Sequence, residues 1–268
     1  MPLAVCATPI GNLDDVTLRV LAELREADVV LCEDTRRTRI LLDRHGIQAR
    51  LVSFHRHNEA ARTEEALSRL ARGERIALVS DAGLPGVNDP GARLVAAALG
   101  AGAPTTVLPG PSAVETGLVA SGLVGDRYQF VGYLPRRDGE RAALALELAR
   151  WPHAVVAFES PRRLPGSLSA LAEAMPGRPA AICRELTKRF EEVVVAPLSV
   201  LASRFTEPAR GEITVVLGST PALPDDRESD ALAAVRELVG AGVTRRRAAE
   251  VVSRLTGTPR NALYRNSL

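Results

Sequence analysis

A single lysine, Lys188, stands in a chain that otherwise carries its positive side chains as thirty-three arginines. Lysine can give up its proton near neutral pH when its surroundings lower its pKa, whereas arginine stays charged. Lys188 follows an apolar run, within the segment RELTKR at residues 184–189. Two interpretations are open: an amine that acts in catalysis or orients a substrate, or a surface lysine left in an Arg- and Ala-rich composition.

The bulk composition limits the class of protein. With 268 residues, 46% of them hydrophobic, the chain is long enough for two ordinary domains or one large α/β unit. The net charge of +2 is nearly balanced, so any contact with nucleic acid must come from local patches. Apolar runs are too short to span a membrane, and the first residues predict a strand rather than a signal peptide. Cys6, Cys32 and Cys183 lie in expected strands without metal-ligand spacing, which indicates buried thiols in a reducing cytoplasm.

Apolar β runs alternate with amphipathic stretches over residues 1–121, which predicts an α/β domain with a mostly parallel sheet. Its strands are expected at residues 3–8, 29–33, 50–54, 76–80 and 105–108. Its helices are expected at residues 17–27, 35–45, 58–72, 90–100 and 112–121, with Thr17, Thr35 and Ser112 as caps. A Gly-rich break then opens a second α/β domain, residues 122–218, for which a mixed sheet is expected.

The second domain repeats the alternation in a different pattern. Its strands are expected at residues 128–132, 154–159, 180–185, 192–195 and 212–217, and a short helix begins at Pro197. Residues 219–228, rich in Pro and Asp, predict a linker. Residues 229–268 predict a small helical C-terminal unit that is locally basic. It is either a helix–turn–helix or a packing appendage with a solvated arginine face.

Glycine and proline gather in the loops that follow the strands of the first domain, at residues 8–13, 33–38, 80–91 and 109–112. Ligands bind beyond the carboxyl ends of strands in open α/β sheets, so these aligned loops predict a ligand cleft. The glycine spacing fits neither a dinucleotide fingerprint nor a P-loop. The loops carry Asp34, Asp81 and Asp89, which suit a ligand with a cationic or hydroxyl-rich part.

Six blocks of this sequence resemble, in order and spacing, those of the ribosomal RNA small subunit methyltransferase I family of the tetrapyrrole-methylase superfamily. The blocks are ATPIGNL from Ala7, CEDTR from Cys32, SDAGLPG from Ser80, PGPSA from Pro109, FESP from Phe158 and RELTK from Arg184. The resemblance covers residues 3–217, and the helical tail resembles the family's C-terminal appendage. It implies a two-domain tetrapyrrole-methylase-like fold in a homodimeric, cytoplasmic enzyme that uses S-adenosylmethionine, with the cofactor between the domains. It further implies methylation of the ribose 2′-hydroxyl of a cytidine in the decoding region of 16S rRNA, without membrane contact or a structural metal.

The resemblance implies roles for individual residues. A ribose hydroxyl is a weak nucleophile, so methyl transfer needs in-line geometry and a base or hydrogen-bond acceptor. Lys188 is the first candidate, either as a neutral amine or as a donor that fixes the ribose. Glu185 and Glu159 are alternatives, although Glu185 is equally well explained as a partner of Arg184 or Arg162. The residues expected around the cofactor are Pro9, Gly11, Asp81, Ala82, Gly83, Pro85, Val87 and Ser112. Those expected to contact RNA, together with the helical tail, are Arg36, Arg37, Arg39, Arg136, Arg137, Arg162 and Arg163.

Two positions depart from the family pattern. Arg37 and Arg162 stand where histidine is expected, which suits contact with phosphate but removes any histidine-based role. His55 and His57 follow a strand, and without further ligands a loop that orders substrate or cofactor is a better interpretation than a metal site.

Two other functions compete with rRNA methylation. The first is carbon methylation of a porphyrin-like molecule, which the arginine-rich loops and basic tail disfavour relative to RNA. The second is a ligand-sensing regulator whose tail reads DNA as a helix–turn–helix. A sensor has no need of Lys188 beside a cleft.

Substitution of Lys188 tests its role. We expect Lys188→Ala to lose methyl transfer and still bind cofactor, which a single-turnover assay and calorimetry measure separately. Lys188→Arg is expected not to restore transfer if the amine moves a proton. Full activity in the Arg variant would mean that only the charge matters.

Overall fold

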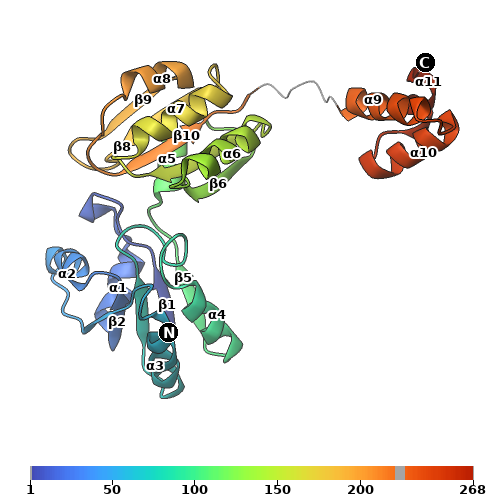
Figure 1. Cartoon of the computed structure of the whole chain (residues 1–268). Helices are drawn as coiled ribbons and strands as arrows, with labels where there is room; N and C mark the ends of the chain where they lie inside the picture. The colour runs from blue at the N-terminus through green and yellow to red at the C-terminus, as the bar shows by residue number, and fades with distance from the viewer. Residues whose placement is uncertain (1, 221–226, 268) are drawn as a thin grey trace. The chain divides into compact units, whose positions relative to one another are not determined.

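The protein is described by a computed structural model that covers residues 2–220 and 227–267 (Figure 1). It forms two compact units, Met1–Ser219 and Thr220–Leu268. The described part of the first unit contains two five-stranded sheets, and that of the second is helical. This confirms the expected fold class.

The first sheet is wholly parallel, with the strand order β3-β2-β4-β1-β5. Its strands are β1 (Leu3–Cys6), β2 (Val29–Cys32), β3 (Leu51–Ser53), β4 (Ile76–Val79) and β5 (Thr105–Leu108). Its helices are α1 (Leu18–Glu26), α2 (Thr35–Arg44), α3 (Glu59–Ala71) and α4 (Ala92–Gly100). Successive side chains in a strand point to opposite faces. Ala4 and Cys6 therefore pack with α1 and α2, whereas Leu3 and Val5 pack with α3 and α4.

The caps of these helices match the sequence analysis only in part. The Thr17 hydroxyl accepts the N–H of Val20 at the start of α1, as expected. At α2 the cap is Asp34 rather than Thr35, because the Asp34 carboxylate lies one residue earlier and accepts the N–H of Arg36.

The direction of the crossovers changes at the edge strand β3. The chain leaves β1 and β2 for helices on one face, but it leaves β3 and β4 for α3 and α4 on the other. Loops that diverge in this way open a crevice at the carboxyl ends of the strands. Thr8 and Gly83 join the two loops there, with N–H to carbonyl distances of 2.8 Å and 3.0 Å. Gly83 has a φ of 74°, a conformation that glycine adopts without steric cost.

The second sheet is mixed, as expected, with the order β6-β7-β10-β8-β9. Its strands are β6 (Tyr128–Tyr133), β7 (Ala154–Glu159), β8 (Pro179–Arg184), β9 (Glu192–Pro197) and β10 (Ile213–Leu217). β6 and β7 are parallel, and β10 runs antiparallel to both β7 and β8. One face is covered by α6 (Asp138–Ala149), α7 (Leu164–Ala174) and α8 (Leu198–Arg204).

The other face of this sheet is covered by α5 (Ala113–Ala120). The sequence assigns this helix to the first domain, but its buried Val114 and Leu118 pack with Val156 and Val216 of the second sheet. Gly117 permits the approach, since a Cβ there would lie 2.9 Å from Cγ2 of Thr214. The packing therefore changes from the first sheet to the second before α5, ahead of the Gly-rich break. Ser112 is the N-cap residue of α5, as expected, but its hydroxyl bonds the Glu115 carboxylate and does not accept a helix N–H.

The second compact unit is built from α9 (Arg227–Gly240), α10 (Arg245–Thr256) and α11 (Arg260–Asn266). It has its own small core, formed by Ala231, Val235, Ala248, Ala249, Val252 and Leu263. Of the linker expected at residues 219–228, residues 221–226 lie outside the described part of the chain. Within the described part, helices are too short or too polar to cross a membrane.

Cys6, Cys32 and Cys183 are free and buried in β1, β2 and β8, which confirms the expected burial of these thiols. Burial is also the main cause that raises the pKa of Cys6 and of Cys183 to about 12, so both thiols stay protonated at neutral pH.

Arg178 ties together the ends of several elements around the second sheet. It is 3% exposed, and burial lowers its pKa. Its guanidinium donates to the carbonyls of Leu148, His153 and Gly218, at 2.7, 2.7 and 2.9 Å. These carbonyls lie near the end of α6, before β7 and after β10. Nη1 also lies 3.6 Å from the sulfur of Met175. A buried cation that is satisfied by neutral acceptors depends on each of these bonds.

Arg178→Met keeps the aliphatic stem and removes three donors. We expect it to lower the free energy of unfolding by about 3 kcal/mol, because buried carbonyls lose their partners. Urea denaturation followed by the fluorescence of Trp151, the chain's one tryptophan, measures this. The control is Arg127→Met at an exposed position, expected to change stability by less than about 0.5 kcal/mol. Equal effects of the two substitutions would contradict the structural role of Arg178.

Candidate active site

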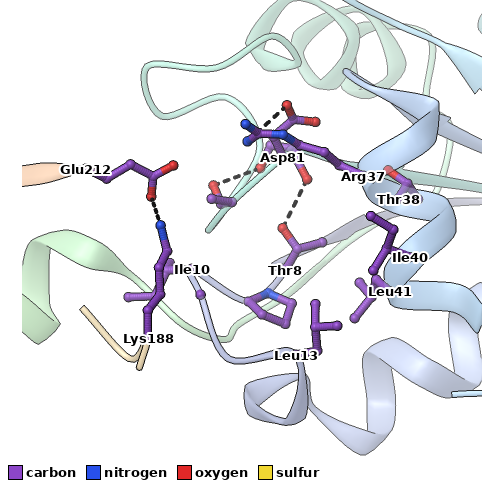
Figure 2. A pocket seen from close by; sticks show the side chains of 14 residues that line it. Thr8, Ile10, Leu13, Arg37, Thr38, Ile40, Leu41, Asp81, Lys188 and Glu212 are labelled. Atoms are coloured by element: carbon purple, nitrogen blue, oxygen red, sulfur yellow. Dashed lines mark hydrogen bonds and ion pairs between the residues drawn. The ribbon is translucent and has the colours of Figure 1, made fainter. Parts of the chain in front are cut away.

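A cavity of about 240 Å³ lies at the crevice where the loops after β1 and β4 diverge (Figure 2). Three segments that follow strands of the first sheet line it: residues 8–13, residues 37–41 of α2, and residues 80–82. Lys188, which follows β8, and Glu212, which precedes β10, come from the second sheet. Apolar walls with a few charged groups are typical of small-molecule sites.

Lys188 is held by two carboxylates. Its ammonium donates to Oε1 of Glu185 and to Oε2 of Glu212, both at 2.9 Å. Burial lowers the pKa of Lys188, but the hydrogen bonds and charges of Glu212 and Glu185 outweigh it and raise the pKa above its usual value. Burial raises the pKa of Glu185, but the hydrogen bonds from Lys188 and from the Glu212 N–H, together with the charges of Lys188 and Arg184, outweigh it, so the net shift is downward. The amine is therefore protonated at neutral pH and acts as a donor.

The turn that carries Lys188 is strained. Glu185 and Thr187 have φ values of 53° and 63°, in the left-handed region that is unfavourable for residues with a Cβ, above all for a β-branched one. Hydrogen bonds hold the turn there: the Glu185 N–H donates to the Glu212 carbonyl, and the Thr187 hydroxyl accepts the N–H of Asn12, both at 3.0 Å. Such strain is often found at functional sites.

Gly11 allows the loop after β1 to lie directly against this turn. A Cβ on Gly11 would fall 2.5 Å from Cγ of Lys188 and 2.8 Å from the carbonyl oxygen of Leu186. Real Cβ atoms do not approach so closely, so the position needs glycine. The contact fixes the direction from which the Lys188 side chain enters the cavity.

Arg37 and Asp81 form a second charged pair in the cavity (Figure 2). Nη1 of Arg37 lies 3.6 Å from Oδ2 of Asp81. Oδ1 of Asp81 accepts the N–H of Asp34 at 3.0 Å, which fixes the carboxylate relative to the start of α2.

The pKa values of two carboxylates near this pair, Asp34 and Asp89, are shifted in opposite directions. The side-chain hydrogen bond from Arg36 is the main cause that lowers the pKa of Asp34 to about 2. Burial, and next the charge of Glu33, raise the pKa of Asp89 to about 6. Asp34 thus belongs to a surface ion pair, while Asp89 lies in a partly buried acidic surrounding.

The residues predicted around the cofactor separate into two groups. Pro9, Gly11, Asp81 and Ala82 line the cavity. Those that lie outside its lining are Gly83, Pro85, Val87 and Ser112. Gly83 supports the wall through its bonds to Thr8.

The structure separates the alternative catalytic carboxylates. Glu185 lies beside Lys188, and its partners are not the expected Arg184 or Arg162, since Arg184 pairs with Glu192 at 2.9 Å. The Glu159 side chain is fully buried, 2.5 Å from Arg163, and bonds the Ser167 hydroxyl; it lies outside the cavity lining.

Glu212 was not predicted as a site residue from the sequence. Its position immediately before the apolar strand β10 is the one sequence feature that bears on its role. β10 pairs with β8 so that Ile213 lies opposite Arg184. An antiparallel register of this kind sets Glu212 against Glu185. It became recognisable only once strand order was known, because the two carboxylates are 27 residues apart in sequence.

The arginines predicted to contact RNA differ in their surroundings. Arg36 pairs with Asp34, Arg137 with Glu140 and Arg163 with Glu159, while Arg39 donates to the carbonyl of Ala49. Arg136 and Arg162 are exposed, and neither side chain has an ion pair or hydrogen bond to the described residues.

His55 and His57 lie edge to face, with ring centroids 5.9 Å apart. Across residues 2–220 and 227–267, clusters of three His, Cys, Asp or Glu side chains suited to a metal ion are absent.

The fold and the crevice correspond to a known class of enzyme. The family model of tetrapyrrole (corrin/porphyrin) methylases matches residues 2–202. The crystal structure of the methyltransferase CobJ is similar to this chain with a TM-score of 0.63 and 24% identity, covering 81% of this chain and 94% of that one. Uroporphyrin-III C-methyltransferase from Thermus thermophilus, complexed with S-adenyl homocysteine, gives a TM-score of 0.58 and 21% identity over 81% and 97% of the two chains. Fold and site together define a methyltransferase of the tetrapyrrole-methylase type.

A closer similarity specifies the family. Ribosomal RNA small subunit methyltransferase I of Mesorhizobium japonicum is 43% identical over 272 residues, which cover 99% of this chain and 91% of the relative. The chain belongs to the ribosomal RNA small subunit methyltransferase I family, as the six sequence blocks predicted.

Gly11→Ala tests the contact between the two loops. The added Cβ must push the Lys188 turn away from the cavity, and a displacement near 1 Å can reduce a rate roughly a hundredfold. We expect a loss of methyl transfer of that order with the melting temperature little changed. The control is Gly100→Ala, where nothing lies within 4 Å of the added Cβ. Wild-type turnover by Gly11→Ala would show that the Lys188 position does not matter.

Proposed function

We propose that this protein transfers the methyl group of S-adenosylmethionine to the ribose 2′-hydroxyl of a cytidine in the decoding region of 16S rRNA. We further propose that it acts as a homodimer in the cytoplasm. The observation that carries the proposal is the protonated Lys188, fixed by Glu185 and Glu212 in a cavity of the sheet crevice. Membership of the ribosomal RNA small subunit methyltransferase I family supports the choice of rRNA.

The cavity residues fit the cofactor. Pro9, Gly11 and Ala82 offer backbone that a ligand can approach closely, and Asp81 offers a carboxylate to a cationic group. A solved relative of the same fold holds S-adenyl homocysteine, the product of such a donor. When bound, the cofactor supplies an electrophilic methyl group, whose bond to sulfur breaks as the bond to the ribose oxygen forms.

Lys188 and Glu212 have different roles at the ribose 2′-hydroxyl. Lys188 is an ammonium, so of its two predicted roles the donor is the one that its surroundings favour: it fixes the ribose oxygen. Glu212 binds Lys188 through one carboxylate oxygen, and its side chain is 62% exposed, which leaves the other oxygen accessible. The Glu212 carboxylate accepts the proton of the 2′-hydroxyl as the oxygen attacks. Glu185 positions Lys188 and does not touch the substrate.

Exposed arginines that follow β6 and β7 bind the RNA backbone. Arg136 and Arg162 leave their guanidinium groups available for phosphate, which supports backbone contact rather than sequence reading. The second unit adds the exposed Arg246, Arg254 and Arg260, whose side chains have no ion pair or hydrogen bond to the described residues.

The function is tested on substrate. Unmethylated small ribosomal subunits and uroporphyrinogen are each incubated with the protein and labelled cofactor, and rRNA nucleosides are analysed by mass spectrometry. We expect a 2′-O-methylcytidine in the decoding region. Label in uroporphyrinogen alone would favour the tetrapyrrole alternative, and turnover on either substrate would exclude a pure sensor.

Glu212→Gln tests the acceptor. The amide keeps a hydrogen-bonding oxygen for Lys188 but cannot take a proton, so we expect kcat to fall by about a hundredfold or more while cofactor affinity stays within about twofold. Glu207→Gln, at an exposed position, serves as the matched control. A Glu212→Gln enzyme with normal kcat would eliminate the carboxylate as proton acceptor.

A further inference from the structure

We propose that Arg37 and Asp81 together bind the α-amino-acid end of the cofactor, with Arg37 taking the carboxylate and Asp81 the ammonium. The inference rests on the proposed function, because it assumes that S-adenosylmethionine occupies the crevice. Arg37, which the sequence predicts to contact RNA, is thereby assigned to the cofactor site.

Only one oxygen of the Asp81 carboxylate accepts a hydrogen bond from the described residues. Oδ1 accepts the N–H of Asp34, while Oδ2 accepts no hydrogen bond from any described residue. The side chain is 22% exposed and lines the cavity. A partly buried carboxylate oxygen without a donor is a ready acceptor for an ammonium group.

The Arg37 guanidinium is also unused. Its distance of 3.6 Å to Asp81 is too long for a hydrogen bond, and Arg37 donates to no described side chain or carbonyl. Its neighbour Arg36 is bound instead, with two hydrogen bonds to Asp34 at 3.1 and 2.8 Å. Arg37 therefore keeps all its donors available in the cavity, and a guanidinium matches a carboxylate with two parallel bonds.

Both signs of charge within 3.6 Å select the kind of ligand. An α-amino acid carries its ammonium and its carboxylate on one carbon, so a cation and an anion side by side complement both. An RNA phosphate would meet Arg37 but would be repelled by Asp81 next to it. The pair therefore favours a zwitterion over a phosphate.

Calorimetry with two ligands, without RNA, tests the proposal. S-adenosylhomocysteine carries the amino-acid end, and 5′-methylthioadenosine lacks it. We expect Arg37→Gln to weaken S-adenosylhomocysteine by about tenfold to a hundredfold, as for a lost charge-assisted pair, and to leave methylthioadenosine unchanged. Asp81→Asn is expected to do the same.

The matched control is Arg44→Gln. Arg44 lies on the same helix, is 56% exposed against 60% for Arg37, and pairs with Asp14 outside the cavity. We expect it to bind both ligands as the wild type does. Retained methylthioadenosine binding also shows that each variant is folded.

Two outcomes overturn the assignment. Unchanged S-adenosylhomocysteine affinity in Arg37→Gln would return Arg37 to RNA binding, and an equal loss for both ligands would mean a general change in the cavity. The proposed function is tested independently of this site. If the wild type binds S-adenosylhomocysteine more tightly than methylthioadenosine but does not methylate rRNA, the amino-acid site stands and the rRNA substrate is wrong.

Discussion

The close contact between Gly11 and the turn at residues 185–188 is the constraint on which the site depends. The loop after β1 and the turn after β8 belong to different sheets, and only a residue without a side chain lets them touch. The Thr187 hydroxyl bonds Asn12 across the contact, and the left-handed φ values of Glu185 and Thr187 persist because these bonds hold them. Without this contact, Lys188 would belong to the second sheet alone.

This contact brings charged side chains from both sheets into one cavity. Lys188 with its two carboxylates comes from the second sheet, whereas Arg37 and Asp81 come from the first (Figure 2). The parallel sheet supplies the diverging loops after β1 and β4, and the mixed sheet supplies an antiparallel strand that sets Glu212 against Glu185. Each sheet therefore provides one cluster of opposite charges at the cavity.

The sequence predicted the fold class, every described strand, and the loops that meet at the crevice, because period, capping and Gly/Pro content are local signals. It could not predict that α5 packs on the second sheet, since either sheet could bury its apolar face. Glu212 was invisible for the same reason: its role arises from strand pairing. The protonated state of Lys188 depends on two carboxylates brought together by the fold, whereas the neutral amine considered from sequence requires surroundings that lower its pKa.

The scarcity of lysine has a practical consequence. Apart from the α-amino group, Lys188 carries the chain's one primary amine. Reductive methylation with isotopic formaldehyde would therefore place a spectroscopic label on a side chain that lines the cavity, with the α-amino group as the other labelled site. The chemical shift of that label would report directly on Glu185 and Glu212, and on whatever enters between them.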